Sequence, residues 1–354
     1  MISLIKKTIH MLIDKLDSLL LILIEVMPGR VPRRAVLMEK INSELLETNL
    51  DGLTSIDIVI KDKPETKINC FVHPQDIRSG WIANRVKGSD FTRPDKLLSI
   101  CRNSLEQFNE LSVLIDMGAN YGEYYACSKN IAKYIAIEPN PILNKLLKRT
   151  AQDADIYEAA VVPSGTKESE LILNVHPFYS GSSSLLRSND SSVRYRGVDI
   201  KPDPNYTLRL PVDNVSVDDI FNKHVHADQG FFLKIDIEGL DTDIAKEALI
   251  HPLARKAMIQ FELNEEDLSH AFKNLLEISS IECVDAFSFL PLFHLHNDQV
   301  LSRLASGDAN LKEILKELCM PLKEFHSHIL QLSKDCEGYT FGEVIILGNE
   351  LLNK

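Results

Sequence analysis

Apolar and polar positions alternate in blocks along most of the chain, and the blocks predict strands and helices in turn. From residue 111 onward, apolar runs typical of buried strands cover residues 112–117, 133–138, 156–162, 231–237, 257–263 and 281–287. Helical patterns separate them, near residues 121–130, 140–151, 215–223, 240–250 and 266–278. Parallel strands need crossover connections of this length. The pattern therefore predicts an α/β fold with a doubly wound, mostly parallel sheet.

The chain on either side of this core carries further elements. The expected organisation is a helical extension over 1–50, a leading α/β subdomain over 51–110, a core over 111–290 and its C-terminal completion over 291–354. The leading subdomain is expected to hold strands at 54–60 and 68–72 and a helix at 95–110. The completion is expected to hold helices over 309–333 and a closing strand over 338–348.

Residues 1–27 show a heptad-like apolar seam, formed by Ile2, Ile5, Ile9, Leu12, Leu16, Leu19, Leu23 and Val26. Three interpretations stay open: a helix packed on its own domain, a self-association helix, or a helix lying on a membrane surface. The apolar run at 19–24 is far shorter than the roughly 20 residues that span a bilayer. We therefore expect a cytoplasmic protein whose membrane contact, if any, is peripheral. Charges of both signs flank the seam, so protein–protein packing ranks above membrane attachment.

One interval between the third and fourth core strands is longer than a crossover requires. Residues 164–210 are rich in Ser, Asn, Pro and Tyr, and aromatic and basic side chains are interspersed among the serines. Loops of this length in compact domains are usually functional or disordered. We interpret the interval as an insertion that recognises the acceptor; a surface loop without a function is the alternative.

Composition narrows the function classes. Hydrophobic residues make up 44% of the chain and charged residues 25%, which is the mix of a globular protein. The 39 basic and 51 acidic residues give a formal charge of −12, which repels phosphate backbones and argues against nucleic acid as a partner. The six cysteines form no C-x-x-C pair and no cluster with zinc spacing, so we expect reduced thiols and no structural metal.

The loop after the first core strand, residues 116–122 (DMGANYG), carries the first chemical signal. Its glycines do not fit the dinucleotide pattern G-x-G-x-x-G, and Asp116 would repel a pyrophosphate. The same aspartate suits a ligand with an ammonium group, such as S-adenosylmethionine (SAM). Glu138 ends the next strand, 22 positions later, where its two carboxylate oxygens can accept both ribose hydroxyls. Together these two acids predict a SAM site.

Four motifs in order resemble those of the FkbM-like SAM-dependent methyltransferases: residues 116–122, 137–141 (IEPNP), 234–239 (KIDIEG) and 261–263 (FEL). The resemblance covers residues 111–263 and implies a Rossmann-like class I methyltransferase core that methylates a hydroxyl oxygen. It places the cofactor against Asp116, Gly118, Asn120, Gly122, Glu138 and Pro139. It also implies a serine-rich turn at 181–185 (GSSSL) and a His-Asn motif at 294–297 (HLHN). The sequence departs from the family at Asp241, where the family has a longer acid.

Methyl transfer from a sulfonium is an in-line displacement, so the protein must align the reactants and accept the proton of the acceptor hydroxyl. Asp236 is expected nearest the transferred methyl, with Glu262 and His296 as further candidates for the base. Three converging acids, Asp236, Glu238 and Glu262, could instead hold a divalent metal, an alternative that we do not favour. Lys234 and Glu238 have a structural interpretation as well, as an ion pair or a helix cap.

The sequence thus predicts a SAM-dependent O-methyltransferase that acts on a small-molecule or glycan acceptor, a sugar or natural-product hydroxyl. Two other classes stay open. Glu138 would serve an NAD-linked oxidoreductase equally well, although Asp116 would not. A non-catalytic scaffold could retain the fold and use the helix of residues 1–27 to assemble a complex.

Overall fold

The computed structural model describes residues 54–60, 63–73, 76, 78–79, 82, 93–167, 171–175, 180–185, 193–195, 198–200, 208–263, 273–274, 276–293, 298–306, 310–335 and 342–353. The helical extension expected over residues 1–50 lies outside the described residues. So do His294, His296 and Asn297.

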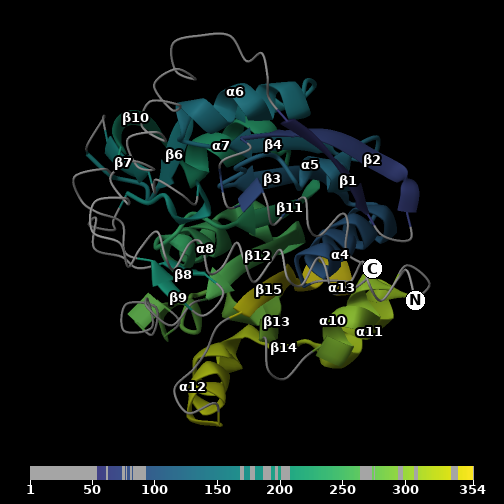
Figure 1. The fold of residues 1–354 in the computed structure, drawn as a ribbon. Coiled ribbons are helices and arrows are strands. Elements are labelled where there is room, and N and C mark those ends of the chain that lie inside the picture. Colours follow the sequence, from purple (N-terminus) through teal and green to yellow (C-terminus); the bar gives the residue numbers. More distant parts are fainter. Residues whose placement is uncertain are drawn as a thin grey trace.

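A central sheet of eight strands has the order β14-β13-β15-β12-β11-β3-β4-β5 (Figure 1). Its parallel strands are β3 (Leu111–Met117), β4 (Lys133–Ile137), β5 (Asp155–Tyr157), β11 (Gly230–Ile235) and β12 (Ala257–Leu263). Strand β15 (Gly342–Gly348) runs antiparallel between β12 and β13 (Phe287–Phe293), and β14 (Met320–Pro321) pairs antiparallel with β13 at the edge. The predicted α/β fold with a mostly parallel, doubly wound sheet is confirmed.

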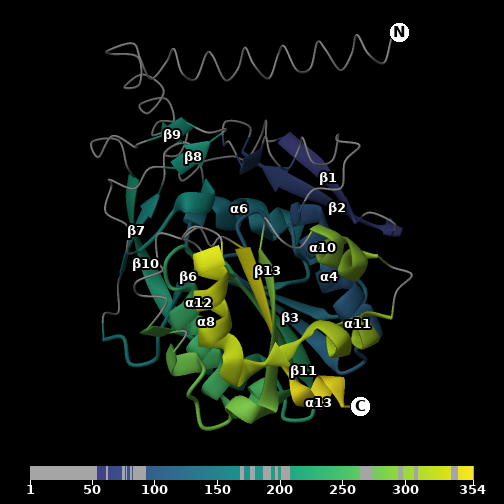
Figure 2. The same cartoon turned by 90° about the horizontal axis from the view of Figure 1, so that it is seen from below.

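Helices cover both faces of this sheet, and the apolar runs of its strands are accordingly buried on both sides. One face packs against α4 (Arg93–Gln107), α5 (Tyr125–Ser128), α6 (Pro141–Thr150), α10 (Asp298–Ala305), α11 (Leu311–Leu318) and α13 (Asn349–Leu352). The other packs against α7 (Val217–His224), α8 (Asp241–Ile250), η3 (Pro252–Lys256) and α12 (Phe325–Asp335). Figure 2 shows α10 and α11 on one side of the strands and α8 and α12 on the other.

The leading segment forms a β-hairpin of β1 (Thr54–Ile60) and β2 (Lys63–Val72). Ile58, Cys70 and Val72 belong to the same apolar cluster as residues of α4 and α6, so the hairpin shares the core of the main sheet. This packing brings the short segment after β2, including Asp76 and Arg78, to the carboxyl ends of the central strands.

The described residues of the insertion form strands and a short turn. A three-stranded sheet joins β6 (Ala159–Val162), β10 (Leu208–Ser216) and β7 (Leu171–Val175), and β8 (Val193–Tyr195) pairs with β9 (Val198–Ile200). A short 3₁₀ helix, η1 (Ser180–Ser182), marks the serine-rich turn. The expected strand at 156–162 is divided: β5 joins the central sheet, whereas β6 pairs with β10.

Other element boundaries differ from the sequence expectation for local reasons. The strand expected at 281–287 begins at Phe287, after the 3₁₀ turn η5 (Val284–Ala286). The helix expected near 121–130 is shortened to α5, because the loop before it contains positive φ angles at Asn120 and Gly122. The helical stretch expected over 309–333 is divided into α11 and α12 by β14 and the 3₁₀ turn η6 (Leu322–Glu324), where Pro321 cannot continue a helix.

In the part of the chain that the structure describes, none of the helices has the length and apolar character needed to cross a membrane. The described cysteines, Cys70, Cys101, Cys127, Cys283 and Cys319, are free thiols.

Candidate functional site

The loop after β3 passes very close to the end of β11. Gly118 adopts φ +76°, and a Cβ atom built there would lie 1.9 Å from the carbonyl oxygen of Asp236. The amides of Gly118 and Ala119 both donate to the carbonyl oxygen of Ile137, at 2.9 and 3.0 Å. A glycine is therefore required at residue 118, because only a residue without a side chain fits the positive φ and the close approach.

Beneath this loop lies a buried ion pair between Asp116 and Lys234. The two residues are direct neighbours in the β3–β11 register, and Lys234 Nζ lies 3.1 Å from Asp116 Oδ1. The hydroxyl of Tyr134 donates to Asp116 Oδ2 at 2.6 Å. Asp116 has 0% of its surface exposed, so its carboxylate supports the loop from below.

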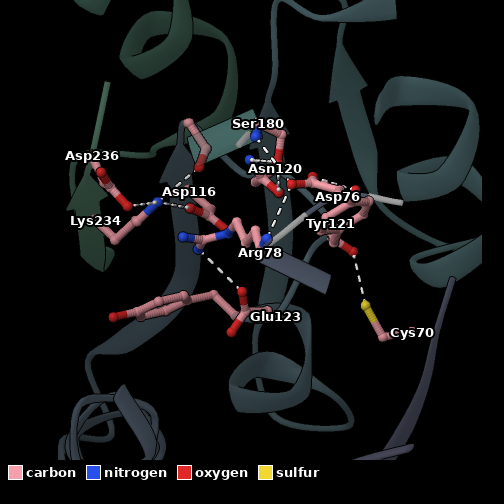
Figure 3. A network of polar contacts seen from close by, with 12 residues as sticks. Cys70, Asp76, Arg78, Asp116, Asn120, Tyr121, Glu123, Ser180, Lys234 and Asp236 are labelled. Atoms are coloured by element: carbon pink, nitrogen blue, oxygen red, sulfur yellow. Dashed lines mark hydrogen bonds and ion pairs between the residues drawn. The ribbon is translucent and has the colours of Figure 1, made fainter. Parts of the chain in front are cut away.

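Lys234 connects this pair to the loop and to the next acid. Its ammonium donates to the carbonyl oxygen of Gly118 at 2.8 Å and lies 3.4 Å from Asp236 Oδ2 (Figure 3). Burial alone lowers the pKa of Lys234, but the negative charges of Asp116 and Asp236 outweigh it and raise the pKa above its ordinary value. Lys234 thus bridges Asp116, Asp236 and the carbonyl of Gly118, in agreement with the ion-pair interpretation.

Glu138, at the end of β4, faces the pocket from the other side of the loop. Its Oε2 accepts from the amide of Asn120 at 2.8 Å, and its Oε1 accepts from the amide of Asn140 at 2.9 Å. The side chain of Asn140 caps α6 by accepting from the amide of Ile142. Burial raises the pKa of Glu138 to about 7, although both backbone hydrogen bonds oppose this shift. The two backbone hydrogen bonds therefore hold the Glu138 carboxylate in a fixed orientation.

The turn after β11 presents a second group of acids. The side chain of Asp236 is one-third exposed, at 33%, and Glu238 follows with φ +54°. The amides of Ile237 and Gly239 donate to the two carboxylate oxygens of Asp241, each at 3.2 Å. Burial and the neighbouring Asp236 raise the pKa of Asp241 to about 7. The departure at position 241 thus has a structural account, because this carboxylate closes the turn that presents Asp236 and Glu238.

Glu262 lies at the end of β12, opposite Glu343 of β15 in the antiparallel register. Burial raises the pKa of Glu262 well above its ordinary value, and the nearby charges of Asp236 and Glu343 raise it further. Among the described residues, no three His, Cys, Asp or Glu side chains converge in a way that could hold a metal ion.

Asp76, which the sequence analysis did not identify, connects three parts of the chain. Its Oδ1 accepts from the backbone amides of Arg78, at 3.0 Å, and Ser180, at 3.2 Å. Its Oδ2 accepts from the hydroxyl of Tyr121 at 2.6 Å. Ser180 in turn exchanges hydrogen bonds with the side-chain amide of Asn120, at 3.2 and 3.3 Å. Asp76 therefore joins the leading segment, the loop after β3 and the insertion into one polar network (Figure 3).

No sequence motif marks Asp76. The only signal is an acid two positions before Arg78, shortly after a predicted strand.

A pocket opens at the carboxyl ends of β3, β4 and β11. It is lined by Arg78, Gly118, Asn120, Ile137, Glu138, Pro139, Ala160, Val161, Leu173, Ser180, Gly181, Ser183, Ser184, Leu185, Asp236, Ile237, Glu238 and Leu240. The lining includes Gly118, Asn120, Glu138, Pro139 and Asp236 among the residues expected from sequence.

Three of the expected residues lie outside this lining. Asp116 supports the loop from below, and Glu262 lies further along the sheet edge beside Glu343. Gly122 packs against α6, where an added Cβ would lie 2.6 Å from a side-chain atom of Leu147. The serine turn of the insertion contributes directly to the pocket, and the hydroxyl of Ser184 donates to the carbonyl oxygen of Glu238 at 2.7 Å.

Comparison with known proteins gives a match to a protein-family model and to several solved structures. Residues 116–280 match the family model described as Methyltransferase FkbM domain. Among solved structures, the chain is similar to the plantazolicin methyltransferase BamL in complex with a triazolic desmethylPZN analog and SAH, with 12% identity, coverage of 78% of this chain and 92% of that chain, and a TM-score of 0.37.

Two further similarities are weaker still in identity or TM-score. The plantazolicin methyltransferase BpumL in complex with SAH has 13% identity, coverage of 77% and 89%, and a TM-score of 0.34. Cofactor-bound Rv0187 from MTB has 8% identity, coverage of 72% and 78%, and a TM-score of 0.32. In the comparison with curated proteins, none matches this chain.

Proposed function

We propose that the protein is a SAM-dependent O-methyltransferase that acts on a hydroxyl of a sugar, glycan or natural product. The match of residues 116–280 to the FkbM methyltransferase domain model supports the methyltransferase class. The observation that carries this proposal is the pocket in which Gly118, Glu138 and Asp236 come together at the ends of three adjacent parallel strands. Ligands of open α/β sheets bind at this edge of the sheet.

The chemistry of the lining fits SAM. Glu138 offers carboxylate oxygens to the two ribose hydroxyls, and the apolar side chains of Ile137, Val161 and Leu240 suit the adenine ring. Glu238 supplies negative charge for the ammonium group, and Asp236 supplies it for the sulfonium, which SAH lacks. Asp116 contributes indirectly in this proposal, because it holds Lys234, and Lys234 holds the carbonyl of Gly118.

When bound, SAM supplies a methyl group that is already activated for displacement. The residues of this chain must then orient the acceptor and accept its hydroxyl proton. Asp236 is suited to accept that proton, because its carboxylate reaches the pocket and Lys234 holds it from behind. Glu262 is a weaker candidate, because it lies outside the pocket lining, opposite Glu343 in the β12–β15 register. His296 stays a prediction, since it lies outside the described residues.

Two experiments test this function. Calorimetric titration with S-adenosylhomocysteine (SAH) and with NAD separates the three classes: we expect binding of SAH alone. Binding of NAD alone would support an oxidoreductase, and binding of neither would support a scaffold.

Transfer of a labelled methyl group from SAM onto a panel of glycans and natural-product alcohols then identifies the acceptor class. Label released by base-catalysed ester hydrolysis, or found on nitrogen, would contradict transfer to a hydroxyl.

A further inference from the structure

Acidic side chains outnumber basic ones in the described lining of the pocket. Among the described lining residues, three are acids, namely Glu138, Asp236 and Glu238, and Arg78 is the single base. Lys234 lies nearby but is not part of the lining, because its ammonium is committed beneath the loop to Asp116 and the carbonyl of Gly118. A ligand of this pocket that carries both signs of charge would therefore find its positive partner in Arg78.

Arg78 is held in place by its backbone and its side chain. Its amide donates to Asp76 Oδ1 at 3.0 Å, and Asp76 also binds Tyr121 of the loop after β3. Its guanidinium lies 3.0 Å from Glu123 Oε1. The side chain of Glu123 is 6% exposed and that of Arg78 is 22% exposed, so the glutamate lies behind the arginine and the arginine faces the pocket.

The guanidinium points toward the loop after β3 and the ion pair beneath it. Figure 3 shows the Arg78 side chain extending from the Asp76 network toward Asp116 and Lys234. Its positive charge is near enough to lower the pKa of Lys234, whose ammonium donates to the carbonyl oxygen of Gly118. The planar guanidinium of an arginine has five N–H donors and can pair with more than one carboxylate. Arg78 can therefore contact Glu123 and also bind the carboxylate of a ligand in the pocket.

We propose that Arg78 binds the carboxylate of the methionine portion of SAM. This inference rests on the proposed function, because it assumes that SAM occupies the pocket. Of the three charged groups of SAM, the ammonium and the sulfonium are positive and suit the acids of the lining. The carboxylate is the only negative group, and Arg78 is its only cationic counterpart among the described lining residues. Arg78 is thus a specificity-determining residue for an amino-acid-bearing cofactor.

A chemical double-mutant cycle tests this assignment. The ligands are SAH and decarboxylated SAH, which lacks only the carboxylate, and the proteins are the parent, Arg78→Gln and Arg78→Lys. We expect Arg78→Gln to weaken SAH binding roughly 10- to 150-fold, the loss typical of a hydrogen bond to a charged group. The same substitution should change the affinity for decarboxylated SAH less than about threefold. Arg78→Lys should retain part of the SAH affinity, because it keeps the charge but loses the fork.

Arg303→Gln is the matched control, since Arg303 forms an ion pair with Glu317 on the surface, away from the pocket. It should leave both affinities unchanged. If Arg78→Gln weakens both ligands by the same factor, or neither, the assignment of Arg78 to the carboxylate is wrong while the proposed function stands. If the parent binds neither ligand, the proposed function fails and this inference fails with it. The lysine variant keeps the test informative if the glutamine variant does not fold.

Discussion

The ammonium of Lys234 lies 3.1 Å from the carboxylate of Asp116, and neither side chain is more than 6% exposed. Both residues lie near the ends of adjacent central strands, and the loop that lines the pocket rests on them through the bond from Lys234 to Gly118. Asp116, which the sequence analysis predicts to contact the cofactor, therefore shapes the pocket indirectly, through the strands beneath the loop. The stability of the fold and the shape of the pocket are coupled at this pair.

Lys234→Met should destabilise the protein strongly. The substitution leaves Asp116 buried with no cation beside it, and removing one partner of a buried pair typically costs about 3–5 kcal/mol. Urea unfolding measures this loss. Lys246→Met is the control, because its pair with Glu277 is partly exposed, at 29% and 41%, and should be worth less than about 1 kcal/mol. Equal losses in the two variants would show that the Asp116–Lys234 pair has no special importance.

Glu138 should make cofactor binding depend on pH. Its pKa is about 7, so the carboxylate that accepts ribose hydroxyls forms as the pH rises through neutrality. We expect the affinity for SAH to rise about tenfold between pH 6 and pH 8, measured by calorimetry. Glu138→Gln should bind weakly and lose this dependence. A parent profile that is flat over this range, or that falls, would contradict the assignment.

The same shift has the opposite sign for the stability of the ligand-free protein. Burial raises the pKa of Glu138 in the folded state above its unfolded value, so the unfolded chain ionises first as the pH rises. The free energy of unfolding should therefore fall as the pH increases from the ordinary glutamate range to about 7. Glu138→Gln should remove that part of the decline.

Asp76→Ala should disturb the pocket without touching the ligand. The substitution removes the acceptor for the amides of Arg78 and Ser180 and for the hydroxyl of Tyr121. We expect SAH binding at least about tenfold weaker, because leaving these partly buried donors unsatisfied costs about 1–3 kcal/mol. Asp285→Ala is the control, because Asp285 pairs with Lys323 on the surface at 82% exposure. Parent-like SAH affinity in Asp76→Ala would show that the network does not shape the pocket.

Asp236→Asn should separate binding from chemistry. The amide keeps the shape of the side chain but cannot accept a proton, so we expect SAH affinity close to that of the parent and turnover at least about a hundredfold lower. Initial rates at saturating SAM, once an acceptor is found, measure this effect. Unchanged turnover would exclude Asp236 as the base and leave Glu262 and His296 as the candidates.

Part of this arrangement follows from local sequence and part does not. The positions of Glu138 and Asp236 could be predicted, because each ends an apolar run that only a buried strand explains, and parallel strands end at the same edge. The burial of Asp116 could not, since it depends on the cross-strand register with Lys234 and on Tyr134. Tertiary pairing of β10 likewise divides the apolar run at 156–162 into two sheets.

The contribution of the leading segment is the hardest part to predict. Asp76 and Arg78 reach the pocket only because β1 and β2 pack on α5 and α6, far along the chain from the methyltransferase motifs. Nothing within residues 73–79 distinguishes them from other surface residues in the sequence. Their importance follows from hydrogen bonds to residues at 121 and 180, which no local pattern records.

The proposed function depends on the binding of SAM in the pocket beside Glu138. Calorimetric titration of the parent and of Glu138→Ala with SAH at pH 8, with NAD in parallel, tests it most directly. We predict that the parent binds SAH and not NAD, and that Glu138→Ala binds SAH roughly 10- to 150-fold more weakly while it unfolds cooperatively like the parent. Equal SAH affinity in the two proteins, or no SAH binding by the parent, would contradict the account.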